Sequence, residues 1–311
     1  MSAEASLAVA AAALLAFALD RAFGEPRDRW HPVSWLGRLL APLGQWALCG
    51  ASARAQFARG TAAWLLVALA IGFAAGLAQR WLAQALPPAL LAVALAVLLK
   101  PLVAWRMLAE EVAAVEAALA HSLDAGRTRV ARICSRDTSR LDAHGVRETA
   151  LESLAENFND SLVAPLFWFA VAGLAGAALY RFANTADAMW GYRGRWEYAG
   201  KFAARADDVL SWVPARLAAL LIAPPRLWPR LPAQAARTSS PNGGWPMAAL
   251  ALRLAVQLRK PGHYVLNAGA ASPSAAHTVQ ALRICGRAAV GACVLLAAAS
   301  ALRAAAPEFG C

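Results

Sequence analysis

Two windows of the sequence each run for twenty residues without a formally charged side chain, at 60–79 and 161–180. A helix needs about 20 apolar residues to cross the ~30 Å hydrocarbon core of a bilayer. The composition agrees, because 59% of the residues are hydrophobic and only 16% are charged, whereas soluble domains have about 45–50% and about 25%. The two windows therefore predict an all-α, polytopic integral membrane protein.

Three further apolar segments extend the predicted topology. Residues 81–99 are uncharged but contain a Pro-Pro pair at 87–88, so we expect the helix to start at the prolines and to carry Lys100 near its far end, where a long side chain can reach polar surroundings. Residues 5–19 and 288–302 are also uncharged. No basic region precedes the first of them, so we interpret it as a retained helix and not as a signal peptide. About four transmembrane helices are expected.

The distribution of charge predicts an orientation. The net charge is +11, and the arginines gather between the apolar segments, as the positive-inside rule describes for cytoplasmic loops. Neither zinc-finger spacing nor an aromatic-basic platform accompanies them, so no nucleic-acid partner is expected. Both termini are predicted to lie outside a plasma (inner) membrane. The chain is predicted to be one integral-membrane domain, 1–311, with cytoplasmic loops at 20–60, 107–160, 181–208 and 224–285.

The window 161–180 does not fit a simple crossing, because the segment that follows it is as basic as the segment before it. Pro165, Gly173 and Gly176 favour a re-entrant hairpin or a buried, broken helix, which membrane proteins tolerate where protein surrounds the backbone. The stretch 209–223 is interrupted by a proline and an arginine and is also expected to pack without crossing. One or two re-entrant or buried helical segments are therefore predicted beside the four spans.

The cysteines do not indicate a disulfide or a metal site. They are odd in number and form no C-x-x-C pair, whereas zinc sites need clustered ligands. We interpret them as small apolar residues. They are Cys49, Cys134, Cys285, Cys293 and Cys311.

The stretch RETALESLAENFND, residues 147–160, contains the strongest candidate site. On a helix from about Val146, Glu152, Glu156 and Asp160 recur every four residues and form one acidic stripe. Like charges at this spacing repel, and the stripe runs directly into an apolar segment, where an unneutralised carboxylate is costly. We therefore expect cationic groups to face the stripe, and Mg²⁺ is the candidate because it takes carboxylate and phosphate oxygens. The alternative is a solvated helix face interspersed with arginines.

Three further polar clusters lie at 19–37, 180–217 and 237–246. In the first, prolines fix the backbone around a histidine and two acids. In the second, two adjacent aspartates point in different directions on a helix, so one is expected to hold an arginine and the other a metal. In the third, successive N–H groups of a Ser-Pro-Asn-Gly-Gly turn can form an anion nest. The candidates are Asp20, Glu25 and His31; Asn184, Asp187, Arg193, Arg205, Asp207, Asp208 and Arg216; and Ser240 and Asn242.

The sequence contains, in this order, the motifs LD, GEP, HPV..LG, SRDTSRLD, ES.AEN..D..VAPLFW, Y...NT.D.M.GYR, AAR.DDVLSWVPARL and SPNGGWP. Together they resemble the adenosylcobinamide-phosphate synthase family of cobalamin biosynthesis, called CobD or CbiB, over roughly residues 14–265. The sequence departs from the family pattern in several places, and Lys260 and its neighbours lack an expected glycine-rich LGG. Glu25 replaces the usual aspartate of GDP, Ala188 stands within the expected DSM, and Met247 follows WP where a glutamate is common.

The resemblance implies a membrane enzyme that joins a carboxylate of adenosylcobyric acid to (R)-1-amino-2-propanol, or to its O-phosphate, giving adenosylcobinamide or its phosphate. The implied acid-amine ligase uses ATP as co-substrate and Mg²⁺ as metal, without a tightly bound organic cofactor. The implied partners are the corrinoid, the aminopropanol, the lipid bilayer and other membrane enzymes of the pathway.

No P-loop motif is present, so an ATP site has to be built from the polar clusters. We assign roles as hypotheses. Magnesium ligands are Glu152, Glu156, Asp160 and Asp208; phosphate ligands are Arg193, Arg205, Arg216, Ser240 and Asn242; proton transfer falls to His31 or Asp187; and further polar site residues are Asp20, Glu25, Asp137, Asn157, Asn184 and Asp207.

Two alternatives from other classes remain. A corrinoid transporter or permease is expected to carry ionisable residues within its spans, and the clear spans have essentially none. A membrane phosphotransferase is suggested by the Asp207–Asp208 pair, but the spaced acidic motif of such enzymes is not found.

Overall fold

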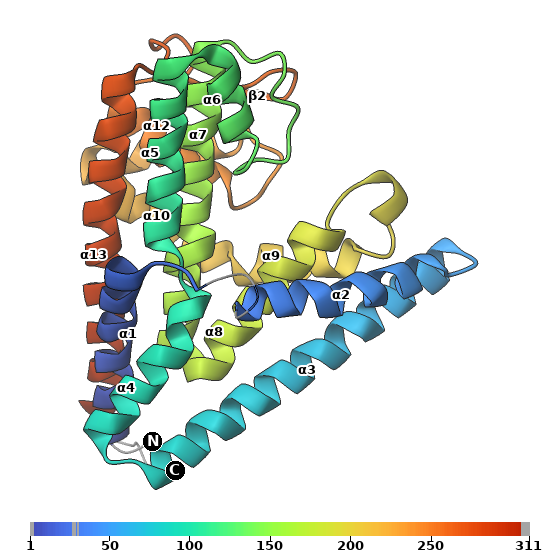
Figure 1. Ribbon diagram of the computed structural model, residues 1–311, viewed down its shortest axis with the longest axis vertical. Coiled ribbons are helices and arrows are strands. Elements are labelled where there is room, and N and C mark those ends of the chain that lie inside the picture. The colour runs from blue at the N-terminus through green and yellow to red at the C-terminus, as the bar shows by residue number, and fades with distance from the viewer. Residues whose placement is uncertain (1–2, 27–28, 30, 306–311) are drawn as a thin grey trace. The chain divides into compact units, whose positions relative to one another are not determined.

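The computed structural model describes residues 3–26, 29 and 31–305 (Figure 1). The chain divides into two compact units, each assembled from separate stretches of sequence. The first unit comprises Met1–Ala104, Ala164–Leu210 and Cys293–Cys311, and the second comprises Trp105–Val163 and Ser211–Ala292. Neither unit is one continuous stretch of sequence, so the two units are not consecutive domains. The prediction of one membrane domain with cytoplasmic loops stays a prediction.

The first unit is made of helices. They are α1 (Ala3–Phe23), α2 (Pro32–Leu48), α3 (Ala53–Ala85), α4 (Pro88–Leu99), η2 (Lys100–Leu102), α8 (Ala164–Trp190), η4 (Gly194–Trp196), α9 (Lys201–Leu210) and the end of α13 (Ala275–Ala305). Helix α4 starts at the Pro-Pro pair and is followed by Lys100, as predicted. Helix α1 packs along α4, and α3 packs along α8 (Figure 1). Trp64, Phe182 and Trp190 form the centre of the core between α3 and α8.

The second unit combines helices with one small β-hairpin. Its elements are α5 (Trp105–His121), α6 (Leu123–Val130), α7 (Ala143–Phe158), the π-helical turn η3 (Asn159–Val163), α10 (Trp212–Ile222), η5 (Pro225–Arg230), α11 (Leu231–Ala235), α12 (Gly244–Leu254), β1 (Leu258–Lys260), β2 (Tyr264–Leu266) and the start of α13. The strands are antiparallel, with Leu258 opposite Leu266. Helix α7 begins at Ala143 because Asp142 caps it, accepting the Gly145 N–H at 2.7 Å, so the predicted start at about Val146 is three residues late.

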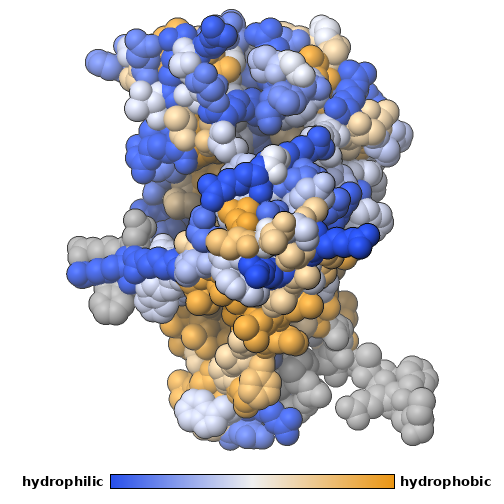
Figure 2. All heavy atoms as spheres, turned by 90° about the vertical axis from the view of Figure 1, so that its right-hand side faces the viewer, coloured by the Kyte–Doolittle hydropathy of each residue, from blue (hydrophilic) through white to orange (hydrophobic). Residues whose placement is uncertain are grey.

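Four helical stretches of the described residues are long and apolar enough to cross a membrane: Ala53–Ala85, Pro88–His121, Ala143–Trp190 and Ala275–Leu302. Helices α3 and α4 expose large apolar side chains, including Leu66, Leu69, Phe73 and Val97. On the face drawn in Figure 2, hydrophobic residues gather in one broad area, as expected of a surface that meets lipid. The all-α polytopic fold is confirmed. The four stretches differ from the predicted four, because they include the segment with 161–180 and not α1.

Helix α8 is interrupted in its middle and folds back on itself. Ala172 and Gly173 have non-helical backbone angles, and Gly173 has φ 63° and ψ −151°. A Cβ on Gly176 would lie 2.3 Å from the carbonyl oxygen of Trp168, although eight residues of straight helix rise about 12 Å. The two halves therefore run back along each other, and Ala143–Trp190 is not one straight crossing. The predicted broken, hairpin-like segment is confirmed.

The break is completed by a side chain from another helix. The Leu174 N–H, which directly follows the two non-helical residues, donates to Oε1 of Gln79 on α3 at 2.6 Å. This satisfies a backbone group that lipid could not satisfy. A Cβ on Gly173 would lie 2.4 Å from the same Gln79 oxygen, so glycine is required both for the backbone angles and for this contact.

Candidate functional site

The predicted site residues fall in both units, and each group is described within its own unit. The first unit holds Asp20, Glu25, His31, Asn184, Asp187, Arg193, Arg205, Asp207 and Asp208. The second holds Asp137, Glu152, Glu156, Asn157, Asp160, Arg216, Ser240 and Asn242. A single pocket that contains both groups stays a prediction.

In the first unit, Lys100 at the end of α4 joins the two predicted acids. Its Nζ lies 2.9 Å from Oε1 of Glu25 and 3.6 Å from Oδ1 of Asp20. Asp20 is fully buried near the end of α1, whereas Glu25 lies in the turn between α1 and α2. From the sequence, Lys100 was predicted only to be a charged residue near the end of a membrane helix, where its long side chain can reach polar surroundings. Its actual role is to compensate two carboxylates that burial would otherwise make costly.

His31 fixes the other oxygen of Glu25. Its Nδ1 accepts the Val33 N–H at 3.2 Å and caps α2, so its proton must be on Nε2, which donates to Oε2 of Glu25 at 2.7 Å. Burial raises the pKa of Glu25, but the hydrogen bonds from His31 and Lys100 and the charge of Lys100 outweigh it, so the pKa is lowered overall. Glu25 is therefore a fixed anion. Both ring nitrogens of His31 are engaged, and its role in proton transfer stays a prediction.

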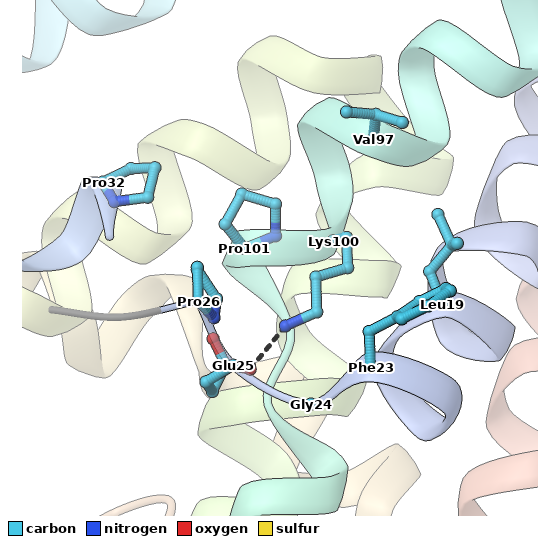
Figure 3. A pocket seen from close by; sticks show the side chains of 9 residues that line it. All are labelled: Leu19, Phe23, Gly24, Glu25, Pro26, Pro32, Val97, Lys100 and Pro101. Atoms are coloured by element: carbon cyan, nitrogen blue, oxygen red, sulfur yellow. Dashed lines mark hydrogen bonds and ion pairs between the residues drawn. The ribbon is translucent and has the colours of Figure 1, made fainter. Parts of the chain in front are cut away.

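A pocket of about 390 Å³ opens beside this cluster. Figure 3 shows Glu25 and Lys100 pointing toward each other at one side of the pocket, while Leu19, Phe23 and Val97 form apolar walls. The pocket therefore combines a compensated charge pair with an apolar lining.

The acids of α8 and α9 have separate partners within the first unit. Asn184 donates to Oδ1 of Asp207 at 3.5 Å, and Arg205 pairs with Asp208 at 3.6 Å. The aspartate that pairs with an arginine is Asp208, which was assigned to magnesium, and that assignment stays a prediction. Burial raises the pKa of Asp208, and Arg205 opposes that shift only in part. Asp187 accepts the Gly191 N–H through its backbone oxygen at 2.6 Å, and Arg193 is exposed.

In the second unit, two carboxylates of α7 are neutralised by arginines from other segments. Arg259 of β1 donates to the fully buried Glu148 at 3.0 Å, and Arg136 donates to the buried Glu152 at 2.5 Å. Burial lowers the pKa of Arg136, but Glu152 outweighs burial and raises it. The expectation that cations face the stripe is therefore confirmed for Glu152. The sequence did not identify either arginine as the partner.

Tyr264 adds a neutral donor beside Glu152. Burial, followed by the charge and the hydrogen bond of Glu152, raises the pKa of the Tyr264 phenol, which therefore stays protonated. The Tyr264 hydroxyl also contacts Sδ of the buried Met247 at 3.7 Å. Met247, one of the positions that depart from the family pattern, therefore contacts Tyr264, which is a partner of Glu152 in the acidic stripe.

The C-terminal half of the stripe is more open. Glu156 is exposed and forms no ion pair with any side chain in the described part of the chain. A Cβ on Gly243 would lie 2.9 Å from Oε1 of Glu156, so the Ser-Pro-Asn-Gly-Gly turn closely approaches this carboxylate. One turn later, Asp160 accepts from Nδ2 of Asn159 at 2.8 Å.

These contacts test how well the stripe fits a magnesium ion. Within the described residues, no three His, Cys, Asp or Glu side chains are grouped closely enough to hold a metal. Mg²⁺ usually takes one or two carboxylates and completes its shell with water and phosphate oxygens. Glu152 is already held by Arg136 and Tyr264, so Glu156 and Asp160 are the members of the stripe that fit. The magnesium site stays a prediction.

Arg216 organises the turn at 240–244. Its guanidinium stacks on Trp212 and Trp245, with 4.3 Å and 4.7 Å to the ring centres, and donates to Oδ1 of Asn242 at 2.8 Å. Ser240 Oγ accepts the N–H groups of Asn242 and Gly243 at 3.2 Å and 3.0 Å. Two N–H groups of the turn are therefore bound by its own serine hydroxyl, and the phosphate-binding roles of these residues stay predictions.

Two predicted site residues make only local contacts among those described. Asn157 donates to the carbonyl of Ser153 in its own helix at 3.0 Å, and Asp137 accepts the Ser139 N–H at 2.9 Å in an exposed turn. The described cysteines, Cys49, Cys134, Cys285 and Cys293, are free, as expected, and Cys311 lies outside the described residues.

Comparison with known proteins gives consistent matches over most of the chain. The family described as CobD/Cbib protein matches residues 13–290. A cobalamin biosynthesis protein CobD of Rhodobacter capsulatus is 41% identical over 308 residues, covering 91% of this chain and 94% of that protein. The proteins of the same name from Stutzerimonas stutzeri and Dehalococcoides mccartyi are 44% and 35% identical, covering 78% and 82% of this chain and 80% and 85% of their own lengths. No solved structure matches the chain significantly.

Proposed function

Since the chain belongs to the CobD/Cbib family of cobalamin biosynthesis proteins, we propose that it is an adenosylcobinamide-phosphate synthase. In this proposal an ATP-dependent ligase joins a carboxylate of adenosylcobyric acid to the amine of (R)-1-amino-2-propanol or of its O-phosphate. One carboxylate oxygen leaves on a phosphoryl group derived from ATP, the amine nitrogen takes its place on the carbon, and the amine loses a proton. The observation that carries the proposal is the family match over 13–290.

The acidic stripe of the second unit supports this chemistry. Phosphoryl transfer depends mainly on positioning and on neutralising charge. Glu156 is exposed and has a glycine turn against it, and Asp160 follows one turn later. In the proposal these two carboxylates hold Mg²⁺, which supplies positive charge for the phosphates of ATP. Arg259 ties the hairpin to α7 at Glu148, and Arg136 ties the segment before α7 to the same helix at Glu152.

The proposed location follows from the same chemistry. ATP is cytoplasmic, so the polar segments that bind it are proposed to lie on the cytoplasmic side of the plasma (inner) membrane. Lipid, the corrinoid and the amino alcohol are the proposed partners, together with other membrane enzymes of the pathway. His31 or Asp187 is proposed to accept the amine proton.

The direct test is a reaction with purified full-length protein in nanodiscs. Adenosylcobyric acid, aminopropanol phosphate and Mg-ATP are supplied, and the amide product is measured by mass spectrometry. Glu156→Gln is expected to abolish product formation, because it removes a proposed metal ligand without changing its size. Glu110→Gln is the matched control, since Glu110 is exposed and pairs only with Arg106 among the described residues.

Two results would contradict the proposal. Full activity of Glu156→Gln would remove the stripe from the mechanism. Accumulation of corrinoid in sealed vesicles without any covalent product would indicate a permease.

A further inference from the structure

The turn of the β-hairpin in the second unit forms a pocket that the proposed roles do not use. The pocket has a volume of about 420 Å³. Four of its residues carry polar groups, namely a guanidinium, an ammonium, an imidazole and a phenol. It is lined by Arg259, Lys260, Pro261, Gly262, His263, Tyr264 and Val265.

The hairpin holds these side chains in a defined arrangement. Lys260 is directly opposite Tyr264 in the register, so both side chains project from the same face. The turn is closed by the His263 N–H, which donates to the Lys260 carbonyl at 2.9 Å. Gly262 has φ 74° and a Cβ added to it would meet nothing within 4 Å, so no side chain obstructs the tip of the turn.

The charges in this pocket are not all compensated. Arg259 is held by Glu148 at 3.0 Å, and the Tyr264 hydroxyl is held by Glu152. Lys260 is half-buried and forms no ion pair with any described side chain, and the exposed His263 ring makes no hydrogen bond to one. A lysine and a histidine that form neither an ion pair nor a side-chain hydrogen bond with any described residue therefore line one small space.

We infer that this pocket binds a phosphoryl group, which Lys260 attracts through its charge and His263 contacts through a ring N–H. Phosphoryl oxygens accept strong, charge-assisted hydrogen bonds from such donors. Glu152 and Glu156 lie close enough to interact electrostatically with Lys260, so they also repel an anion. A divalent cation relieves that repulsion, and binding is therefore stronger with Mg²⁺ present.

The test is direct binding to the purified full-length protein in phosphatidylcholine nanodiscs, without turnover. Inorganic tripolyphosphate is titrated with and without Mg²⁺, and heat of binding is measured. Lys260→Met is expected to weaken binding about tenfold, because a hydrogen bond to a charged group contributes that much or more. Lys260→Arg is expected to retain most of the affinity. Arg230→Met, an exposed arginine outside the pocket, is expected to bind like the unchanged protein.

Further ligands identify the source of the phosphoryl group. A non-hydrolysable ATP analogue that competes with tripolyphosphate assigns the pocket to a nucleotide. Competition by phosphoethanolamine assigns it to a phosphorylated amino alcohol. Loss of tripolyphosphate binding only when phosphatidylglycerol is added to the nanodisc assigns it to a lipid headgroup. Each of these results supports the phosphoryl site.

The inference draws on the proposed function only for the choice of these ligands, and the two can fail separately. If none of the phosphoryl ligands binds, or if Lys260→Met binds as tightly as the unchanged protein, the inference is wrong, whatever the ligase assay gives. If binding depends on Lys260 but no amide product forms in the ligase assay, the site stands and the proposed reaction does not. Thermal unfolding of each variant shows that it is folded.

Discussion

Replacing Gly173 by alanine is expected to destabilise the first unit strongly, because two features of the α8 reversal require glycine. The backbone angles of φ 63° and ψ −151° lie in a region that is essentially restricted to glycine, and placing another residue there costs about 1–3 kcal/mol. The added methyl group would also lie 2.4 Å from Oε1 of Gln79. Gln79 must then move and release the Leu174 N–H, at a cost of about 1 kcal/mol.

Together these effects predict a loss of about 2–4 kcal/mol in the free energy of unfolding. The assay is unfolding of the purified protein in mild detergent, followed by tryptophan fluorescence as the denaturing detergent is increased. Gly72→Ala is the control. Gly72 lies within α3 and its added methyl group meets nothing within 4 Å, so this change should be neutral or stabilising by up to about 1 kcal/mol.

Gln79→Leu supplies an independent check of the same reasoning. It removes the acceptor of the Leu174 N–H and is expected to cost about 1 kcal/mol. Because both changes disrupt one hydrogen bond, the double variant should lose less than the sum of the two single losses. A Gly173→Ala protein as stable as the unchanged one, or fully additive losses, would refute the described reversal.

Two further predictions concern the buried ion pairs. Arg136→Met leaves the Glu152 carboxylate buried without its cation and is expected to lower the free energy of unfolding by about 3–5 kcal/mol. The double variant Arg136→Met/Glu152→Leu should recover much of that loss. Chemical unfolding of the two single variants and the double variant measures both effects. The pKa of Glu25 is lowered in the folded protein. Its ion pairs therefore stabilise the protein fully at pH values above the unfolded-state pKa of about 4.3. This contribution is lost as the pH falls through the lower, folded-state pKa. Glu25→Gln should therefore flatten the acid side of the stability–pH curve, and an unchanged acid side would argue against the network with Lys100.

The membrane fold was largely predictable because its signals are local in the sequence. Charge-free windows indicate apolar helices directly, and the Pro-Pro pair correctly marked the start of α4. The break near Gly173 was also predictable from its glycines and from the basic segment that follows. Helix α7 starts three residues before the predicted start, directly after Asp142, which is a favourable N-cap residue and so a local signal for that boundary.

The partners of the candidate site were not predictable, because they depend on contacts between distant segments. Arg259 is separated from Glu148 by 111 residues, and Gln79 is separated from Leu174 by 95 residues. Nothing in the sequence indicates which of many arginines reaches which carboxylate. The acidic stripe itself could be read from its spacing, and so could the need for cations near it. The arginine that provides one of those cations, and the tyrosine beside Glu152, became visible only in the fold.

The reversal of α8 also has a consequence for how the chain is made. The acceptor for the Leu174 N–H comes from α3, which leaves the ribosome earlier than α8. A newly inserted α8 therefore finds its partner already in place, and the order of synthesis matches the order in which the backbone of the loop can be stabilised.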